Sequence, residues 1–437
     1  MRVLFTAFAA KSHAYTQFPL AWALRTAGHE VCVASQPDLV EDITRAGLTA
    51  VPVGRALQLS EQMGGADSEA EFQHLDEAAL EILDYIYIQL QDVSAARSVD
   101  LTPADLQVRL TAMIWVLQEL SADPMVDDLV DFAKWWRPDL VVWDTMTFAG
   151  PVAAIASGAA HARLLFGLDL IGWIRRHYLN TLHHRPAPLH DDPLEEWLGW
   201  TLQRHGCHFT EQAVTGQWTI DPVPTSLRLP VDHHYLPVRY IPYNGPATLP
   251  HWLRTPAPRP RVCLTLGVSH RETHGQDRVS VGELLDAVAD LDIEVIATLD
   301  SAQKADLGRL PPNVHTTDFV PLDALLPTCA AIIHHGGSGT FQTALTHGIP
   351  QIIVPDMRWD TPWKAERLQD AGAGIRLPDP DHLTAQDVRS ALTTVLNDPA
   401  YTRNATRLRT ETRGTPAPAD IVPALEKLTA RHQQLIR

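Results

Sequence analysis

Short apolar runs alternate with amphipathic segments along the first part of the chain. Residues 2–8 (RVLFTAF) and 30–35 (EVCVAS) have the composition of buried strands, and residues 18–28 between them have a helical pattern with Pro19 in the first turn. Residues 138–167 repeat this order of strand, helix and strand. Strands that alternate with helices predict a parallel, doubly wound α/β sheet, whose ligands bind beyond the carboxyl ends of the strands.

A second series of the same kind begins at residue 261, with apolar runs at 261–267, 293–299, 314–320 and 330–335. Prolines accumulate just before this series, as in DPVPTSLRLP and RTPAPRPR, and a segment of this composition is stiff and extended. We therefore expect two α/β domains of the Rossmann type joined by one linker. The expected boundaries are a first domain at 1–225 with a helical insertion at about 55–135, a linker at 226–258, a second domain at 259–415, and a C-terminal helix at 416–437 that packs back on the first domain.

Composition narrows the class of protein. With 437 residues, of which 45% are hydrophobic and 20% charged, the chain has the make-up of a soluble globular protein. Its 52 acidic and 35 basic residues give a net charge of -17, which disfavours binding to nucleic acid or to an anionic membrane. No apolar run approaches the ~18 residues of a membrane-spanning helix. The ligand is therefore expected to be small.

The cysteines and the start of the chain predict a cytoplasmic protein. The apolar run of MRVLFTAFAA is too short for a signal peptide and is expected to be the first strand. The cysteines form no CxxC motif and no metal-ligand spacing, so we expect buried thiols in a reducing compartment. These cysteines are Cys32, Cys207, Cys263 and Cys329.

A glycine-rich turn, HHGGSGT at residues 334–340, joins a predicted strand to a predicted helix. Without Cβ atoms an anion can approach the backbone N–H groups at a helix start closely, and the helix dipole adds partial positive charge there. His335 can donate a hydrogen bond to a phosphate, whereas His334 is expected to be a buried strand histidine. The alternative is a tight turn without a ligand. The predicted pyrophosphate cradle consists of His335, Gly336, Gly337, Ser338, Gly339 and Thr340.

Several long segments give the chain a resemblance to a known class of enzymes. They include HHGGSGT, HGIPQIIVP and DMRWDTPWKAERLQDAGAGIRL in the second half, and PLAWALRTAGHEVCVASQPDL and RPDLVVWDTMTFAGPVAA in the first. The chain resembles antibiotic glycosyltransferases of the GT-B fold, and more closely the macrolide and anthracycline deoxyaminosugar transferases of the desosaminyl type. The resemblance implies two Rossmann-like domains whose parallel sheets face an interdomain cleft, the first binding the acceptor and the second the nucleotide sugar.

The resemblance also assigns residues to the donor diphosphate and the nucleobase. In these enzymes the histidine that opens the glycine motif contacts the diphosphate, and here this is His335. The turn after the strand at 261–267 would bring Ser269 near the phosphates. The loop 319–321 would border the nucleobase, with backbone groups of Val320 as its hydrogen-bond partners.

Asp360 and Thr361 mark a departure from the wider superfamily. Many hexose transferases of this fold have an acid followed by Gln at this place, and the pair holds sugar hydroxyls. A sugar with fewer hydroxyls does not need the missing amide, so the departure favours a deoxysugar. The alternative role for Asp360 is to cap the helix that starts near Pro362.

His13 and Asp144 are the predicted catalytic residues on the acceptor side. His13 is placed in the loop after the first strand, where position alone would suggest a surface residue, and Asp144 ends the strand of LVVWDT. The resemblance implies that this histidine deprotonates the acceptor hydroxyl and that this carboxylate orients it. Both residues follow the carboxyl ends of strands in one sheet, so they can converge.

These features predict an inverting, metal-independent glycosyltransferase that uses no cofactor. It would move a deoxysugar, by resemblance a deoxyaminosugar, from a dTDP donor to a hydroxyl of a hydrophobic polyketide-derived aglycone in antibiotic biosynthesis. Members of the class often require a helper protein related to the cytochrome monooxygenases. The insertion at 55–135 is expected to pack on its own domain, and a docking surface for this helper is its alternative role. A homodimer is a further expected assembly.

Other functions fit the sequence less well. A nucleotide-sugar 2-epimerase shares the fold but needs no acceptor pocket, and a catalytically silent auxiliary subunit would not need His13, Asp144 and His335. A nicotinamide dehydrogenase is disfavoured because the first turn, TAFAAKSHAYTQ, lacks GxGxxG. The histidines at 177–190 and 232–234 have no regular ligand spacing, so no metal site is predicted.

Overall fold

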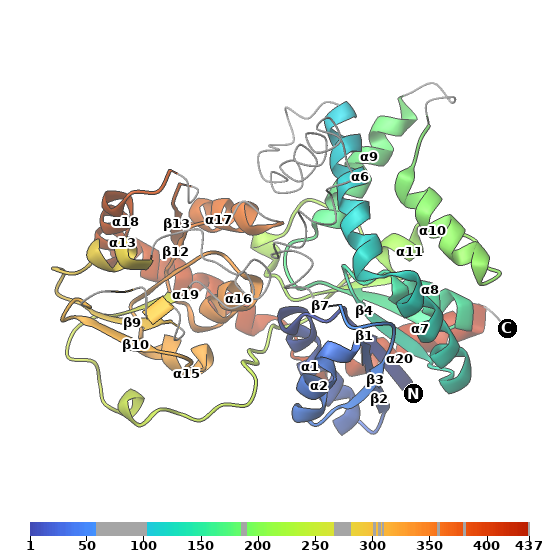
Figure 1. The fold of residues 1–437 in the computed structure, drawn as a ribbon, viewed down its shortest axis with the longest axis horizontal. Helices are drawn as coiled ribbons and strands as arrows, with labels where there is room; N and C mark the ends of the chain where they lie inside the picture. The colour runs from blue at the N-terminus through green and yellow to red at the C-terminus, as the bar shows by residue number, and fades with distance from the viewer. Residues whose placement is uncertain are drawn as a thin grey trace.

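The chain forms two α/β units, the first coloured blue to green and the second yellow to orange in Figure 1. Each unit contains one sheet in which every strand pair is parallel. The predicted fold class is therefore confirmed. The computed structural model describes residues 1–57, 103–184, 190–265, 281–299, 303–304, 307, 310–355, 359–378 and 382–435.

The first sheet has the strand order β3-β2-β1-β4-β5-β6-β7. Its central strands are buried on both faces because helices cover both, as every residue of β4 illustrates. The strand order reverses between β1 and β4, and sheets of this type bind ligands at such a switch point. The strands are β1 (Arg2–Thr6), β2 (Glu30–Ser35), β3 (Thr49–Pro52), β4 (Leu140–Asp144), β5 (Ala160–Leu164), β6 (Trp218–Asp221) and β7 (Tyr235–Pro237).

Helices cover both faces of the first sheet. Apolar residues of α1 and α2 build the core on one face, where α20 joins them, and α6, α7 and α8 build the core on the other. The helices of this unit are α1 (Lys11–Thr26), α2 (Val40–Arg45), α6 (Pro103–Leu120), α7 (Asp123–Trp136), α8 (Ala149–Ser157), α9 (Leu170–His183), α10 (Pro193–Arg204) and α11 (Gln212–Thr215), with 3-10 turns η1 (Pro37–Leu39) and η3 (Thr225–Leu227).

The second sheet has the order β10-β9-β8-β11-β12-β13, so its switch point lies between β8 and β11. Its strands are β8 (Arg261–Thr265), β9 (Glu294–Thr298), β10 (Val314–Thr317), β11 (Ala331–His334), β12 (Gln351–Ile353) and β13 (Gly374–Arg376). The remaining helices are η4 (His251–Arg254), α13 (Val281–Asp286), α15 (Leu322–Leu325), η5 (Leu326–Thr328), α16 (Ser338–His347), α17 (Thr361–Asp370), α18 (Ala385–Asn397), α19 (Pro399–Gly414) and α20 (Pro418–Leu435).

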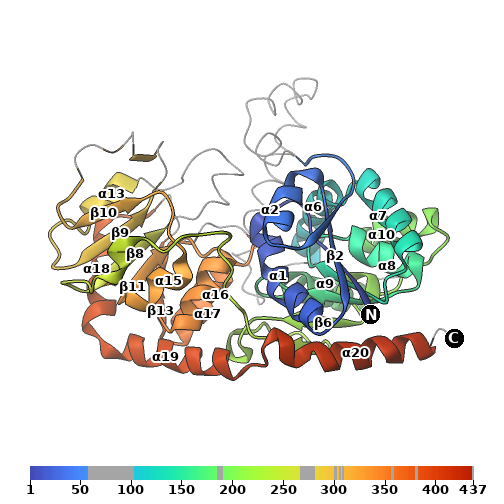
Figure 2. The ribbon, with the colours of Figure 1, turned by 90° about the horizontal axis from the view of Figure 1, so that it is seen from below.

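The segment expected to be the linker, 226–258, contributes a strand to the first sheet. Tyr235–Pro237 form β7, which pairs in parallel with β6, so the chain leaves this sheet only after residue 237. The proline at the end of β7 is tolerated because, among the residues that the structure describes, β7 is the edge strand of its sheet. At the other end of the chain, α19 lies along the second unit and α20 continues along α1 and β5 of the first (Figure 2).

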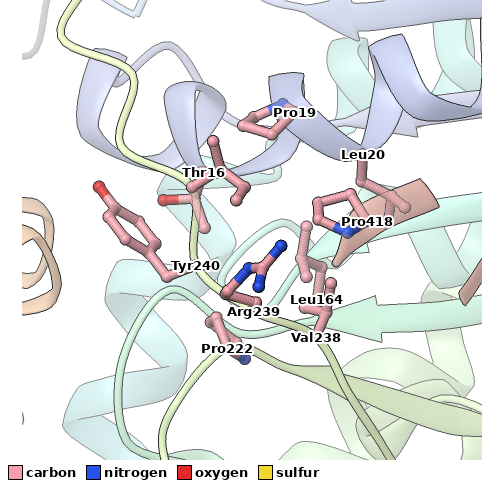
Figure 3. Close-up of a pocket in the computed structure, with 10 residues that line it drawn as sticks. Thr16, Pro19, Leu20, Leu164, Pro222, Val238, Arg239, Tyr240 and Pro418 are labelled. Carbon is pink, nitrogen blue, oxygen red and sulfur yellow. The ribbon is translucent and has the colours of Figure 1, made fainter. Parts of the chain in front are cut away.

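The two chain crossings between the units are hydrogen-bonded to each other. The backbone N–H of Arg239 donates to the carbonyl of Pro416 at 2.7 Å, and its guanidinium donates to the carbonyl of Arg413 at 3.0 Å. Figure 3 shows the small pocket at this junction, where the linker crosses α1. Its volume of ≈ 10 Å³ leaves room for about one water molecule, so this pocket is not a substrate site.

All four cysteines are free thiols, but only two of them are fully buried. Cys263 and Cys329 are buried as predicted, whereas Cys32 and Cys207 are partly exposed. Cys207 follows the turn after α10. The sequence around it has no pattern that separates such a position from one in the core. Among the helices of the described segments, none is both long enough and apolar enough to cross a bilayer.

Candidate active site

His13 lies in the first turn of α1 and not in a loop, which corrects the prediction. Pro19, which was expected to begin the helix, lies inside it. The buried residues Ala14 and Phe18 continue the apolar stripe of the helix upstream of Pro19. Packing of this stripe on the sheet outweighs the one backbone hydrogen bond that a proline removes.

His13 and Asp144 form a buried pair at the switch point of the first sheet. Asp144 ends β4, and α1 follows the neighbouring strand β1. Nδ1 of His13 lies 2.9 Å from Oδ2 of Asp144. The other carboxylate oxygen accepts the backbone N–H of Met146 at 2.9 Å, which fixes its orientation. The structure thus brings the two predicted catalytic residues together.

Two aromatic rings pack against the imidazole of His13, and one of them also contacts an aromatic ring of the second unit. The ring centroids of Phe8 and Phe166 lie 4.4 and 4.0 Å from that of His13. Phe166 stacks in turn on Trp359, with 6.2 Å between centroids and an interplanar angle of 24°. Trp359 has a φ of 50°, in the left-handed region that a bulky residue rarely adopts. Sequence reasoning missed Phe166 and Trp359, because an aromatic residue next to a motif is usually core.

The glycine-rich turn opens α16, directly after β11 at the switch point of the second sheet. Gly336 has a φ of +93°, and a Cβ at this position would lie 2.3 Å from Cγ2 of Thr361, so only glycine fits. The ring of His335 lies over Gly337, where a Cβ would approach Nε2 to 2.9 Å. The start of α16 has no side-chain cap, so its first N–H groups can bind an anion.

His334 is the buried strand histidine that the sequence predicts. Its Nδ1 accepts the backbone N–H of Gly336 at 3.0 Å, so Nε2 carries the proton and donates to Oε1 of Gln351 at 2.8 Å. Desolvation by burial and, to a smaller extent, the nearby His335 together lower the pKa of His334 to about 3. A neutral His334 therefore holds the turn in place.

We expect an acid-dependent loss of stability from His334. Between pH about 6.5 and 3 the unfolded chain binds a proton at this residue and the folded chain does not, so the free energy of unfolding falls as the pH drops. Urea unfolding of His334→Asn should show a pH slope in this window that is shallower by up to about 1.4 kcal/mol per pH unit. The control His251→Asn, which changes an exposed histidine, should keep the wild-type slope. An unchanged slope in His334→Asn would contradict the prediction.

Asp360 is the N-cap residue of α17, but its side chain makes no capping hydrogen bond. Its Oδ1 lies 2.8 Å from Nζ of Lys364, and its Oδ2 accepts the backbone N–H of Leu168 from the first unit at 2.8 Å. The carboxyl-end loops of the two sheets therefore touch at this point. Sequence reasoning missed Lys364 because an Asp–Lys pair four residues apart is common on exposed helices, and only its burial distinguishes it.

The remaining predicted residues are placed as follows. Val320 is buried and its neighbour Phe319 is 52% exposed, in the loop after the carboxyl end of β10. Thr340 lies in the first turn of α16. Ser269 lies outside the described residues. Within the part of the chain that the structure describes, no three His, Cys, Asp or Glu side chains are grouped to hold a metal ion.

Comparisons with known proteins agree with this arrangement. Residues 22–267 match the N-terminal domain, and residues 282–428 the C-terminal domain, of the erythromycin biosynthesis protein CIII-like family. The chain is 55% identical to the aclacinomycin-T 2-deoxy-L-fucose transferase of Streptomyces galilaeus, over 99% of this chain and 97% of that protein. It is 48% identical to the 10-deoxymethynolide desosaminyltransferase of Streptomyces venezuelae, over 99% and 98%. Among solved structures it is similar to the glycosyltransferase VinC in complex with dTDP, with a TM-score of 0.86, 40% identity, and coverage of 99% and 100%.

Proposed function

The chain belongs to the erythromycin biosynthesis protein CIII-like family and is a glycosyltransferase, and we propose that it moves a deoxysugar from a dTDP donor to a hydroxyl of a polyketide-derived aglycone in antibiotic biosynthesis. One observation carries the proposal. The buried His13–Asp144 pair and the uncapped start of α16 lie at the switch points of two sheets whose loops touch through Leu168 and Asp360. A positioned base and an anion site are the two parts that displacement of a diphosphate requires.

His13 acts as the general base of the proposed reaction. Asp144 accepts a hydrogen bond from Nδ1–H, which leaves Nε2 to take the proton of the acceptor hydroxyl. The acceptor oxygen forms a bond to the anomeric carbon while the bond from that carbon to the β-phosphate oxygen breaks, with inversion at the carbon. The carboxylate stabilises the imidazolium that results.

The start of α16 stabilises the leaving group. Electrons of the breaking bond go to the departing dTDP, whose growing charge meets the first N–H groups of the helix and the ring of His335. Placed in this way, backbone donors supply the stabilisation that other transferases obtain from a metal ion. The proposed reaction therefore uses no metal and no cofactor.

Phe319 is the residue expected to stack on the nucleobase. Its ring is 52% exposed although it is large and apolar, and it lies at the carboxyl edge of the second sheet next to Val320. Stacking of a base on an aromatic ring contributes about 1–3 kcal/mol. Phe319→Ala should therefore weaken dTDP binding by about 5- to 150-fold in isothermal titration calorimetry, and Phe319→Tyr should retain it. Equal affinities of wild type and Phe319→Ala would place the base elsewhere.

The relatives guide the choice of substrates. Their names describe transfer of 2-deoxy-L-fucose in the aclacinomycin system and of desosamine to 10-deoxymethynolide, and VinC was crystallised with dTDP. We therefore propose a dTDP-deoxysugar, in particular a deoxyaminosugar, and an anthracycline or macrolide acceptor. The helper protein related to cytochrome monooxygenases, a homodimer and a cytoplasmic location are further parts of the proposal.

Mass spectrometry of incubations tests the proposed function directly. The purified chain is combined with a panel of dTDP-deoxysugars and with anthracycline and macrolide aglycones, each with and without a candidate helper. The expected product has the mass of the aglycone plus one deoxysugar, and dTDP is released in equal amount. Conversion of the donor to an epimer without any aglycone would overturn the proposal.

A further inference from the structure

Lys364 and Asp360 form an ion pair inside the candidate active site. They lie one turn apart at the start of α17, with 2.8 Å between Nζ and Oδ1, and each side chain is only 2% exposed. Burying two charges is costly, so a pair in such a position is a poor device for stability alone. Because this buried pair lies beside a helix start that can bind an anion, a role in binding is the first hypothesis to test.

The ammonium of Lys364 also fixes the hydroxyl of Ser338. Nζ of Lys364 donates to Oγ of Ser338 at 2.8 Å, and Ser338 is the first residue of α16. An ammonium group has donors and no acceptor, so Oγ must be the acceptor in this bond. The hydrogen of the Ser338 hydroxyl then points elsewhere and can be donated to an anion at the helix start.

Asp360 ties the same place to the first unit. Its Oδ2 accepts the N–H of Leu168 at 2.8 Å, and a Cβ on Gly167 would lie 2.2 Å from Oδ2 and 3.0 Å from Oγ of Ser338. The loop 166–168 therefore fits against both the ion pair and the start of α16. Because Phe166 of this loop contacts the ring of His13, one short segment touches the base and the donor side.

Two effects follow for a diphosphate at α16. An unpaired carboxylate of Asp360 near the start of α16 would repel the diphosphate, and the positive charge of Lys364 offsets the negative charge of Asp360. Both oxygens of Asp360 are already engaged within the protein, by Lys364 and by Leu168. Sugar hydroxyls would have to compete with these partners for the carboxylate.

We propose that Lys364 is a positioning residue for the donor diphosphate, which orients Ser338 and neutralises Asp360, and that Asp360 fastens the loop 166–168 instead of holding the sugar. This inference rests on the proposed function, since it assumes that the start of α16 binds the diphosphate. It differs from a sugar-holding role in one measurable respect. Removal of either charge affects the binding of dTDP, which carries no sugar.

Isothermal titration of dTDP into the full-length protein separates the two roles. Lys364→Met should lower the affinity about 10- to 100-fold, the size expected for loss of a charge-assisted contact, and Asp360→Asn should lower it at least about threefold. Lys364→Arg, which keeps the charge, should retain more affinity than Lys364→Met. The control Lys427→Met, at an exposed position of α20, should bind as the wild type does.

A double-mutant cycle tests the orientation of Ser338. If Lys364 acts through this hydroxyl, the losses caused by Ser338→Ala and Lys364→Met overlap, and the double variant loses less than the product of the two. If Lys364→Met does not fold, the charge-neutral variant Asp360→Asn/Lys364→Met takes its place in the measurement of dTDP binding. It should bind dTDP at least about threefold more weakly than the wild type, and thermal unfolding of every variant checks the fold.

The outcomes separate this inference from the proposed function. One set of results would overturn the inference and leave the proposed function standing. In that set the wild type binds dTDP, and both Asp360→Asn and Lys364→Met bind it within about twofold of the wild type. The charge-neutral variant replaces Lys364→Met in this comparison if Lys364→Met does not fold. Absence of dTDP binding in the wild type would overturn the proposed donor, and the inference with it.

Discussion

Replacing His13 by alanine is expected to lower kcat by about 10²- to 10⁴-fold while the affinity for dTDP stays unchanged. In the described structure the imidazole of His13 is hydrogen-bonded to Asp144, with 2.9 Å between Nδ1 and Oδ2. This pair lies in the first unit, on the acceptor side of the site. Without the imidazole the acceptor hydroxyl has no positioned base. Steady-state kinetics with the aglycone and dTDP-sugar identified by mass spectrometry, together with calorimetry of dTDP, would measure both quantities.

Two further variants show whether that loss is chemical or structural. His13→Gln keeps a donor for Asp144 and fills much of the space between Phe8 and Phe166, but it cannot take up a proton, so it should be as slow as His13→Ala. Ser12→Ala changes the exposed neighbour in the same helical turn and should have wild-type kcat. Recovery of activity in His13→Gln would show that the residue acts by packing and not as a base.

The sequence predicted the fold well where strands are central and failed at the β6–β7 edge of the first sheet. Runs such as those of β4 and β8 are buried on both faces, and the apolar pattern reports this burial directly. β6 and β7 have four and three residues and lie in or near the proline-rich segment, so local pattern gives them no signal. They are strands because β5 offers an open edge, which is a property of the assembled sheet.

The candidate site was predictable only in part, for a physical reason. The placement of Asp144 and the glycine-rich turn at carboxyl ends of strands follows from the alternation of strands and helices. The contact between Leu168 and Asp360 joins residues 192 positions apart, and it is made by a backbone N–H that any residue type would supply. No pattern in the sequence encodes such a contact. The burial of Lys364 was hidden for a similar reason, since it depends on how the assembled structure packs around α17.

Asp144→Asn is expected to reduce kcat nearly as far as loss of the base itself, by about 10²- to 10⁴-fold. The amide can still accept the N–H of Met146 through its oxygen, and it then presents NH₂ to Nδ1 of His13. A donor at this place makes Nδ1 the acceptor and puts the proton on Nε2, so the nitrogen that should take the acceptor proton already carries one. The substitution leaves the volume of the side chain almost unchanged.

Because the volume is conserved, Asp144→Asn separates tautomer control from packing more cleanly than a truncation would. The thermal stability and dTDP affinity should stay close to wild type while kcat falls, measured as the rate of glycosylated product at saturating donor and acceptor. The matched control is Asp139→Asn, which removes an acid at the amino end of the same strand β4 and should leave kcat within about twofold of wild type. Wild-type kcat in Asp144→Asn would mean that the carboxylate does not select the tautomer of His13, and proton transfer would then have to begin from another residue.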